Sequence, residues 1–537
     1  MTVIRGGTVV DGTGGAAFSG DVVVDGDRIV DVLHSDGKSG ATATLNAIDA
    51  TGCLVTPGFI DAHTHSDAYL VIEPDAPSKI SQGITTEING QCGGSVAPRY
   101  GEARLSSDWA AVLGDRLTWR SLAEYRGALA AARPAVNTVQ FIGHNTLRSS
   151  VVGYAGRAAT PDELMAMERM LAQALDEGGW GLTTGLIYQP GKYSSPEEVV
   201  ALAKVAAERG GFYATHMRSE GDAILEAIDE VLALVKATGI RAEISHLKTS
   251  GRRNWHKIDA VLDKMQSAVD EGLLLGSDRY PYCAAGTDLD VVLPDWAQEG
   301  AAKAECERLA DATTRQRIVD EIDASGRDWS TVMIGGTWSD ENKAFSGKMV
   351  SDILSRSSRP SFSSRSTGGT GLTGGTCGEV ICDILARDGC KTGAFFFGMS
   401  EENLAKIYSR PWVVPGSDAS LRAPWGPLGK DHPHPRAYGT MPEFFRRLRA
   451  LGISREETIA RMTSVPARRF GLRGRGVLEK GAFADIVVWK EDEFKSSATY
   501  VEPHQFASGV KCVMVNGMVP YLDGSFTGDR GGRFLER

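Results

Sequence analysis

The fold of this chain is decided by a short apolar run that ends in two histidines, Pro57-Gly58-Phe59-Ile60-Asp61-Ala62-His63-Thr64-His65. Short apolar runs bounded by Gly or Pro are typical of buried strands. Runs of this kind, each ending in polar residues, recur along the chain. They are Leu54 to His65, Ile84 to Cys92, Val139 to Asn145, Gly181 to Tyr188, Phe212 to Met217, Ala242 to Lys248, Leu273 to Tyr282 and Val413 to Asp418. We interpret each as a buried strand with a polar carboxyl end.

Several stretches between these runs have the pattern of amphipathic helices. Ser195-Pro196-Glu197-Glu198 is a helix start, because proline fits the first turn and acids favour the positive end of the helix dipole. Ala223 to Thr238 and Lys257 to Glu271 are similar, and each is closed by glycine. Repeated strand–helix units favour an α/β fold with a parallel sheet. We predict a (β/α)8 TIM-like barrel whose polar strand ends gather at one mouth.

The two ends of the chain have the sequence pattern of a β domain. Residues 8–12 and 21–30 are β-branched runs broken by Asp-Gly turns. Residues 481–489 read as another strand, and residues 510–519 as a hairpin around Asn516-Gly517. We therefore predict a small β-sandwich formed by both termini. It takes residues 1–54 and 471–537, and the barrel takes residues 55–470.

A long interval separates the seventh and eighth predicted strands. Residues 288–410 are too many for one loop, so we predict an inserted subdomain there. Within it, Ser355 to Thr376 holds 22 residues, of which 16 are Ser, Thr or Gly. This composition cannot bury a core and is typical of a mobile loop. It indicates no particular function.

Composition excludes several classes of protein. The chain has 537 residues, with 58 Lys and Arg, 68 Asp and Glu, and a net charge of -10, which disfavours binding to nucleic acid or an anionic membrane. It has 8 cysteines without a CxxC pair, which indicates reduced thiols in a cytoplasm. We find neither an apolar signal core nor an 18-residue apolar run, so we expect no membrane span. No feature sets an oligomeric state.

Four of the ten histidines lie at predicted strand ends. His63 and His65 are two residues apart, so on a strand both imidazoles point to the same side and can reach one metal ion. A lone pair of this kind also fits two histidines that hydrogen-bond the backbone. Its position after a first barrel strand favours the metal site.

A second group of metal-binding residue types comes from three other strand ends. His216 and His246 lie 246 − 216 = 30 residues apart, which is one strand–helix unit and puts them on neighbouring strands. Cys92 ends the second strand, beside glycines. A cysteine is most often a small buried apolar residue, but Zn²⁺ accepts mixed Cys and His ligands with one position left open. Cys92, His216 and His246 therefore predict such a zinc site.

Asp418 ends the predicted eighth strand. A strand-end aspartate beside a metal can serve as a ligand, as a general base, or as both. It also fits a helix N-cap, a role for which Ser417 competes. The histidines and cysteine expected around it favour the functional interpretation.

With these motifs the chain resembles the amidohydrolase superfamily and, within it, the D-aminoacylases (N-acyl-D-amino-acid deacylases). The matching segments are residues 57–67, the Cys92 loop, and residues 185–188, 216–220, 244–248, 280–282, 416–418, 434–436 and 471–489. The resemblance covers most of the chain outside about 288–411. Cys92 stands where hydantoinase-like relatives have a bridging lysine, and this points to the D-aminoacylases.

The resemblance implies a metal-dependent hydrolase barrel and a role for each matched residue. Cys92, His216 and His246 would hold one tightly bound zinc. His63, His65 and Asp418 would form a second, weaker metal position, and Asp418 would also be the general base. The substrate would be a small N-acyl-D-amino acid, cleaved to a carboxylate and a free D-amino acid. The stereochemistry comes from the resemblance alone.

The carboxylate of such a substrate needs local cations on an acidic chain. Lys248 lies two residues beyond His246, on the same side of the strand, and Arg436 follows a turn stiffened by prolines. Each also fits a structural reading, as a rim charge or a salt bridge. The resemblance implies hydroxyl contacts from Tyr188 and Tyr280. Tyr282 is a further candidate, although one of the two same-side tyrosines could equally pack in a wall.

Two other functions fit parts of the sequence. The first is a cyclic amidase of the same superfamily, similar to dihydroorotase or hydantoinase. Residues 181–188 contain no lysine that could bridge two metals, which counts against it. The second is a catalytically silent scaffold that binds partners. Such a protein should have lost metal ligands or the base, and all of them are present here.

Overall fold

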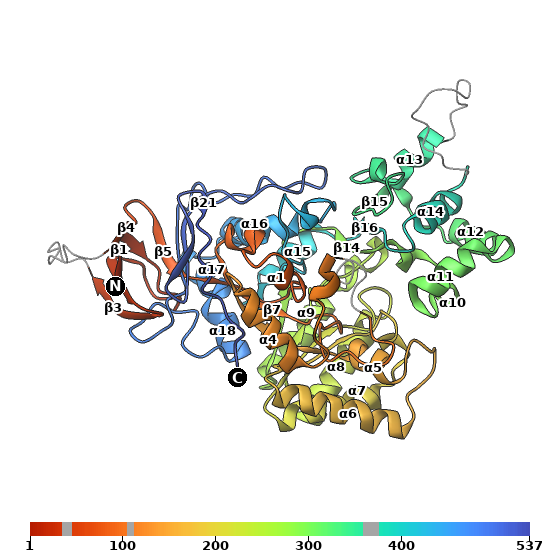
Figure 1. Cartoon of the computed structure of the whole chain (residues 1–537), viewed down its shortest axis with the longest axis horizontal. Coiled ribbons are helices and arrows are strands. Elements are labelled where there is room, and N and C mark those ends of the chain that lie inside the picture. Colours follow the sequence, from red (N-terminus) through yellow and green to blue (C-terminus); the bar gives the residue numbers. More distant parts are fainter. Residues whose placement is uncertain (35–45, 105–111, 358–374) are drawn as a thin grey trace.

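The computed structural model describes residues 1–34, 46–104, 112–357 and 375–537. It has three parts: a barrel in the middle, a β domain at one end that holds the N-terminus, and an inserted subdomain at the other end (Figure 1). The predicted fold class is confirmed. In the described residues no helix has the length and apolar character needed to cross a membrane.

The barrel is made of eight parallel strands, of which the third is interrupted at Phe141 and counts as two elements. The strands are β6 (Phe59–Asp61), β7 (Ile84–Asn89), β8 (Asn137–Gln140) with β9 (Ile142–Gly143), β10 (Gly181–Gly185), β11 (Phe212–His216), β12 (Arg241–Ile244), β13 (Leu275–Arg279) and β17 (Val413–Pro415). Trp180 N donates to Gln140 O at 2.9 Å, which joins β8 to β10. The barrel closes where Ala62 N donates to Pro415 O at 3.1 Å.

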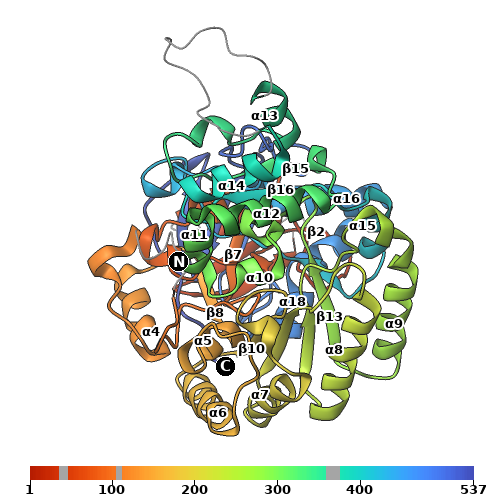
Figure 2. The same ribbon diagram turned by 90° about the vertical axis from the view of Figure 1, so that its right-hand side faces the viewer.

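Helices cover the outside of the barrel, as Figure 2 shows for α5 to α9. The helices are α1 (Tyr69–Ile72), α2 (Pro77–Ile80), α4 (Leu122–Ala132), α5 (His144–Val151), α6 (Pro161–Asp176), α7 (Pro196–Glu208), α8 (Ile224–Thr238), α9 (Ile258–Asp270), α15 (Glu401–Tyr408), α16 (Arg436–Ala450), α17 (Arg455–Met462) and α18 (Ser464–Phe470). The predicted start of α7 is confirmed, because the Ser195 hydroxyl accepts a hydrogen bond from Glu198 N. Gly239 ends α8 in the left-handed conformation that glycine adopts without strain.

The β domain joins both ends of the chain in one nine-stranded sheet. Its strands are β1 (Thr2–Val9), β2 (Phe18–Asp25), β3 (Arg28–His34), β4 (Asn46–Asp49), β5 (Leu54–Pro57), β18 (Ile486–Trp489), β19 (Val510–Val515), β20 (Met518–Leu522) and β21 (Ser525–Phe526). The predicted hairpin at Asn516-Gly517 is present as β19 and β20. The two halves meet where β18 pairs antiparallel with β5.

The boundary between the β domain and the barrel differs from the sequence-based expectation. We expected the barrel to begin at residue 55, but residues 54–57 form β5 in the terminal sheet. The chain crosses into β6 at Gly58, where a β-carbon would lie 2.1 Å from the Thr85 hydroxyl. The apolar run from Leu54 to His65 therefore serves two sheets, which periodicity alone cannot separate.

The insertion has its own sheet and its own core. The sheet orders β14 (Ala285–Asp288), β16 (Gly393–Phe396) and β15 (Val332–Ile334), and the helices are α10 (Asp295–Gln298), α11 (Ala301–Ala310), α12 (Ala312–Ala324), α13 (Val350–Ser357) and α14 (Cys377–Arg387). We expected the insertion to extend to about 410. The structure instead places α15 against α9 of the barrel, where Lys406 Nζ lies 2.9 Å from Asp259 Oδ2. Residues 358–374 of the Ser/Gly-rich stretch lie outside the described residues.

The insertion stands over the mouth of the barrel (Figure 2). Gly251 N and the Trp255 indole both donate to Gly398 O, each at 2.9 Å, which ties the end of the insertion to the loop after β12. At its other end, Gly286 O in β14 accepts a hydrogen bond from Arg436. The insertion thus borders the polar ends of the barrel strands.

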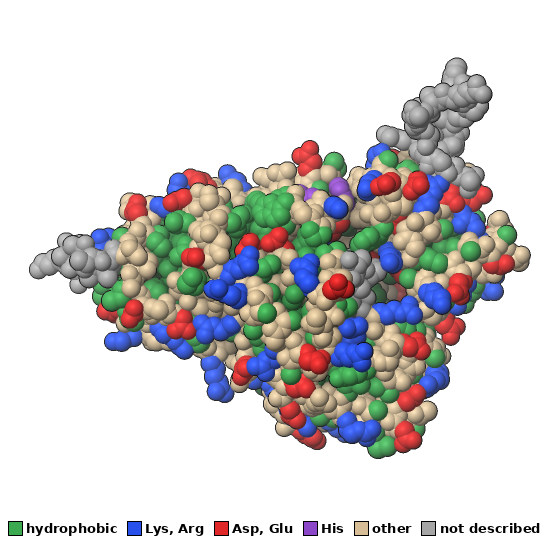
Figure 3. All heavy atoms as spheres, viewed as in Figure 1, with side chains coloured by type: hydrophobic (Ala, Val, Ile, Leu, Met, Phe, Trp, Pro, Cys, Tyr) green, Lys and Arg blue, Asp and Glu red, His purple; other side chains and the backbone are tan. Residues whose placement is uncertain are grey.

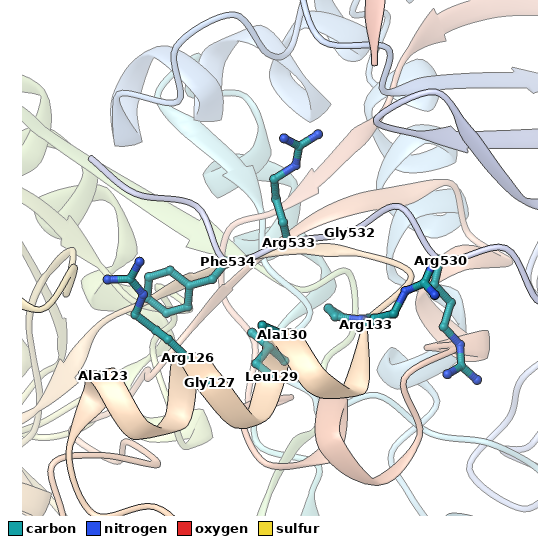
Figure 4. Close-up of a pocket in the computed structure, with 11 residues that line it drawn as sticks. Ala123, Arg126, Gly127, Leu129, Ala130, Arg133, Arg530, Gly532, Arg533 and Phe534 are labelled. Atoms are coloured by element: carbon teal, nitrogen blue, oxygen red, sulfur yellow. The ribbon is translucent and has the colours of Figure 1, made fainter. Parts of the chain in front are cut away.

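A cavity of about 550 Å³ lies away from the strand ends, between α4 and the C-terminal segment (Figure 4). Four arginines line it, and three of them are paired: Arg126 with Glu536, Arg530 with Asp75, and Arg533 with Asp27. These ion pairs tie the C-terminal segment to neighbouring parts of the chain. Basic and acidic side chains are interspersed over the face in Figure 3, so that face presents no field of a single sign.

The separate core of the insertion predicts local unfolding. Replacing the fully buried Ile384 of α14 by alanine removes apolar contacts within that core and should cost about 2–5 kcal/mol of stability. Hydrogen exchange should then rise in the insertion and stay unchanged in β10 to β13. Leu274→Ala, at a side chain that is 61% exposed, is the control. Loss of protection in the barrel and insertion together would show that they unfold as one unit.

Candidate metal centre

Six candidate ligands come together at the carboxyl ends of five barrel strands. His63 and His65 follow β6, Cys92 follows β7, His216 ends β11, His246 follows β12, and Asp418 follows β17. The carboxyl ends of parallel strands open at the same face of a barrel, which explains why residues so distant in sequence meet.

Cys92, His216 and His246 form one potential metal site. Their ligand atoms all lie within 4.8 Å of one another. The Cys92 Sγ atom is 3.3 Å from His246 Nε2, and the rings of His216 and His246 are 4.5 Å apart between centroids. This is the group in which the sequence predicts zinc.

A second potential site contains His63, His65, Cys92 and Asp418, again with ligand atoms within 4.8 Å. The Asp418 Oδ1 atom lies 3.0 Å from His65 Nε2 and 3.4 Å from His63 Nε2. The Cys92 Sγ atom is 3.3 Å from His63 Nε2. Cys92 belongs to both groups, so its thiol lies where two metal positions would meet.

Three candidate ligands occupy a backbone conformation that side chains rarely adopt. The φ angles are +52° at Cys92, +37° at His246 and +51° at Asp418. Left-handed backbone at a non-glycine residue costs about 1–2 kcal/mol. Such strain persists where the surrounding structure enforces it, and it clusters at functional sites.

The donor set fits a zinc ion. Neither ring nitrogen of His216 has a hydrogen-bond partner among the described residues, although the side chain is buried. Its Nε2 atom is 3.6 Å from the nearest carboxylate oxygen, that of Glu220. A buried imidazole without a partner is costly unless a ligand satisfies it, and one Cys with two His is a usual set for zinc with an open position.

Electrostatics favour the ionised forms of Cys92 and Asp418. Burial opposes ionisation of the thiol, but the charges of His63 and His246 outweigh it and bring the pKa of Cys92 well below its usual value. Burial likewise opposes the carboxylate, but Arg436 and His246 outweigh it and lower the pKa of Asp418 well below its usual range. The thiolate is the form of cysteine that binds metals.

Two carboxylates, the buried one of Asp278 and the partly buried one of Glu220, orient the histidine ligands. Neither was among the site residues predicted from the sequence. Asp278 of β13 places Oδ2 3.1 Å from His63 Nδ1, and its Oδ1 accepts a hydrogen bond from His246 N at 2.9 Å. Glu220 places Oε1 2.9 Å from His246 Nδ1. Carboxylates in this position fix the tautomer and ring orientation of a ligand histidine. The available signals were an acid four residues after His216 and a polar residue at a strand end.

The structure brings both predicted cations to the cluster but pairs each of them within the protein. Lys248 Nζ donates to Glu220 Oε1 and, at 3.0 Å, to His246 O. Arg436 Nη1 lies 2.7 Å from Asp418 Oδ2, and its Nη2 donates to Gly286 O at 3.1 Å. The Arg436 Nε atom has no partner in the described residues. That either cation binds substrate stays a prediction.

The three candidate tyrosines differ in position. The ring of Tyr188 lies 4.9 Å from that of His216, so it borders the cluster. The Tyr280 ring is 4.7 Å from the Arg436 guanidinium carbon, and its buried hydroxyl has no partner among the described residues. The Tyr282 hydroxyl lies against α16, where a β-carbon on Gly439 would be 2.5 Å from it. Tyr188 and Tyr280 thus lie beside candidate site residues, whereas the hydroxyl of Tyr282 packs against α16.

The sequence was also compared with known proteins. The model of an amidohydrolase family matches residues 46–367 and 383–521, which is most of the chain. The chain belongs to the amidohydrolase family. It is 34% identical to an N-acyl-D-glutamate deacylase of Alcaligenes xylosoxydans xylosoxydans, covering 100% of this chain and 96% of the relative. It is 31% identical to a D-aminoacylase of the same organism, covering 100% and 97%.

A solved structure of a deacylase has the same fold. The N-acyl-D-glutamate deacylase from Bordetella bronchiseptica, complexed with zinc and a phosphonate inhibitor that mimics the tetrahedral intermediate, gives a TM-score of 0.81 at 32% identity. The match covers 100% of this chain and 99% of that protein. The resemblance to D-aminoacylases in the sequence analysis is therefore confirmed.

The orienting carboxylates predict a measurable effect on metal affinity. In Asp278→Asn and Glu220→Gln, an amide replaces the carboxylate that faces a ligand histidine, and zinc affinity should fall about 10- to 100-fold. Competition against a chromophoric chelator measures this. Glu198→Gln is the matched control, because the buried Glu198 carboxylate lies 2.8 Å from His144 Nε2, and His144 belongs to neither potential metal site. Equal zinc affinity in all three variants would contradict the orienting role.

Proposed function

We propose that this protein hydrolyses the amide bond of N-acyl-D-amino acids, releasing a carboxylate and a free D-amino acid. The observation that carries the proposal is the convergence of six metal-binding side chains at one barrel mouth, in a chain similar over its whole length to deacylases of this class. Its partner would be a small substrate molecule. The eight cysteines, all described and all free, fit a reducing cytoplasm.

Zinc would be held tightly by Cys92, His216 and His246. His63, His65 and Asp418 would provide a second, weaker position. A bound zinc ion lowers the pKa of water to about 7 and polarises a carbonyl oxygen, which supplies the nucleophile and the electrophile that amide hydrolysis needs. The surrounding protein groups supply orientation and proton transfer.

Asp418 would be the general base and then the general acid. The low pKa of its carboxylate keeps it ionised and able to accept a proton from the attacking water. Arg436 holds Oδ2, and His63 and His65 face Oδ1, so the carboxylate has a fixed orientation. The proton would then pass to the amide nitrogen as the carbon–nitrogen bond breaks. Such transfer typically contributes about 10²–10⁴-fold in rate.

The substrate carboxylate would be bound beside Asp418. The Arg436 guanidinium lies there, and guanidinium groups suit carboxylates through paired hydrogen bonds. The Tyr280 ring lies 4.7 Å from the guanidinium carbon of Arg436, and its hydroxyl has no partner among the described residues. The Tyr188 ring lies beside His216. Lys248 would contribute positive charge, with its ammonium held by Glu220. Tyr282, whose hydroxyl packs against Gly439 of α16, fits a wall position better than a contact with the substrate.

The cyclic-amidase alternative is less well supported. β10 contains no lysine, and Cys92 occupies the point shared by the two potential metal positions. The silent-scaffold alternative does not account for six assembled ligands.

A chiral substrate panel tests the proposal. The zinc-loaded protein should release free amine from at least one N-acetyl-D-amino acid and not from its L-enantiomer. Asp418→Asn should lower kcat by about 10²–10⁴-fold, because the amide cannot accept the proton. Ser420→Ala, two residues farther along the same loop, is the control. Opening of cyclic amides without turnover of any acyl-D-amino acid would favour the alternative.

Metal removal gives a separate prediction. Dialysis against a chelator should abolish amine release, because the nucleophilic water depends on zinc. Adding zinc back should restore it, whereas Cys92→Ala should not respond to added zinc at the same concentration. Full activity of the metal-free protein would refute metal dependence.

A further inference from the structure

We propose that Lys79 is a positioning residue for hydrolysis: its buried ammonium binds the Ser417 hydroxyl and the Ala419 carbonyl on either side of Asp418 and so aims the Asp418 carboxylate at the metal centre. This inference rests on the proposed function for its catalytic consequence. The geometry that supports it consists of contacts within the protein and does not depend on the identity of the substrate.

The Lys79 ammonium reaches both neighbours of Asp418. It extends from the short helix α2, and its side chain is fully buried. The Nζ atom donates to the Ser417 hydroxyl at 3.0 Å and to Ala419 O at 2.9 Å. One cation therefore holds the residue before Asp418 and the residue after it.

Asp61 binds both the Lys79 ammonium and the backbone of Ser417. Its Oδ2 atom accepts from Lys79 Nζ at 2.9 Å, and its Oδ1 atom accepts from Ser417 N at 2.7 Å. Asp61 ends β6, two residues before His63. The Lys79–Asp61 pair thus links the first and last strands of the barrel directly below the ligands.

Lys79 and Asp61 act where the backbone is strained. Asp418 has a φ angle of +51°, and Asp418 N donates to His63 O at 2.8 Å. A strained conformation is kept only when surrounding contacts over-determine it. Without these contacts, residues 417–419 could relax, and the carboxylate would turn away from His63 and His65.

A second set of contacts anchors the rest of the same loop. Lys79 Nζ also lies 3.1 Å from Glu87 Oε1, which accepts from the Ser66 hydroxyl at 2.6 Å. The Ser66 hydroxyl in turn accepts from Leu421 N at 2.9 Å. The network therefore extends along the loop to residue 421. It uses the carboxylates of Asp61 and Glu87 to balance the buried ammonium.

Lys79 cannot itself serve as the base or bind substrate. Its ammonium has oxygen partners on every side, and none of its side chain is exposed. Burial opposes its charge, but Asp61 and Glu87 outweigh this and raise the pKa of Lys79. It remains a fixed cation and acts on the reaction only through Asp418.

The test compares three variants of the full-length protein. Lys79→Met keeps the length of the side chain and removes all the hydrogen bonds. Displacement of a catalytic group by about 1 Å can cost about 10²-fold, so kcat should fall about 100-fold while KM changes little. Lys79→Arg should recover part of this loss, because a guanidinium can still donate to Ala419 O and Asp61. Ser417→Ala removes the hydroxyl that accepts from Lys79 Nζ and from Ala419 N, and it leaves the ammonium paired with Asp61 and Ala419 O. We therefore expect kcat to fall about 10-fold.

Cobalt substitution gives a readout that needs no substrate. The visible absorption of bound Co²⁺ reports its ligand geometry, so Lys79→Met and Ser417→Ala should shift the bands of the dicobalt protein. The matched control is Arg475→Met, which removes a buried cation paired with Asp485 in the β domain. It should match wild type in cobalt spectrum and in kcat per folded molecule.

The measurements distinguish failure of the Lys79 proposal from failure of the proposed function. The proposal is overturned if Lys79→Met folds with wild-type kcat and a wild-type cobalt spectrum. It is also overturned if Lys79→Met, like Arg475→Met, loses activity only in proportion to the fraction of unfolded protein. If Lys79→Met does not fold, Ser417→Ala decides, and its wild-type kcat and spectrum would overturn it. Failure of the wild-type protein to hydrolyse any acyl-D-amino acid refutes the proposed function instead. The cobalt spectra still test whether Lys79 positions Asp418.

Discussion

The closure of the barrel between its first and last strands is the constraint on which the centre depends. Ala62 N bonds to Pro415 O, and Asp418 N bonds to His63 O. These contacts bring together residues separated by most of the chain. A small error in the register of this closure would move Asp418 away from His63 and His65. The rest of the barrel sets the distances among Cys92, His216 and His246 in the same way, through parallel registers.

Burying many charged groups is energetically unfavourable, and in this centre the charged groups are paired with one another. Asp278 faces His63, Glu220 faces His246 and Lys248, and Arg436 faces Asp418. Breaking a buried pair is strongly destabilising because it leaves a charge uncompensated. The pairs therefore do two things at once, since they keep the fold intact and they hold each ligand in one orientation.

The other two parts of the molecule bear on the centre from different sides. The β domain supplies β5, which runs through Gly58 into the strand before His63. The insertion places Gly286 against Arg436 and so touches the residue that holds Asp418. The insertion keeps a core of its own, whereas the main core extends from the barrel into the β domain. Each of the three parts contributes a contact within a few residues of the ligands.

The sequence by itself determined the repeated strands, the terminal hairpin and the residue types of the ligands. These are local properties. The pattern of apolar residues indicates each strand, and the histidine, cysteine and aspartate at the strand ends are read directly from the sequence. The tertiary structure alone decided that β5 belongs to the terminal sheet, that Lys248 is held by Glu220, and that Asp278 and Lys79 support the ligands. The physical reason is that closure of the barrel brings these residues next to their partners, which lie far away in the sequence. A lysine on a four-residue helix carries no sign of a bond to residues 338 and 340 positions away.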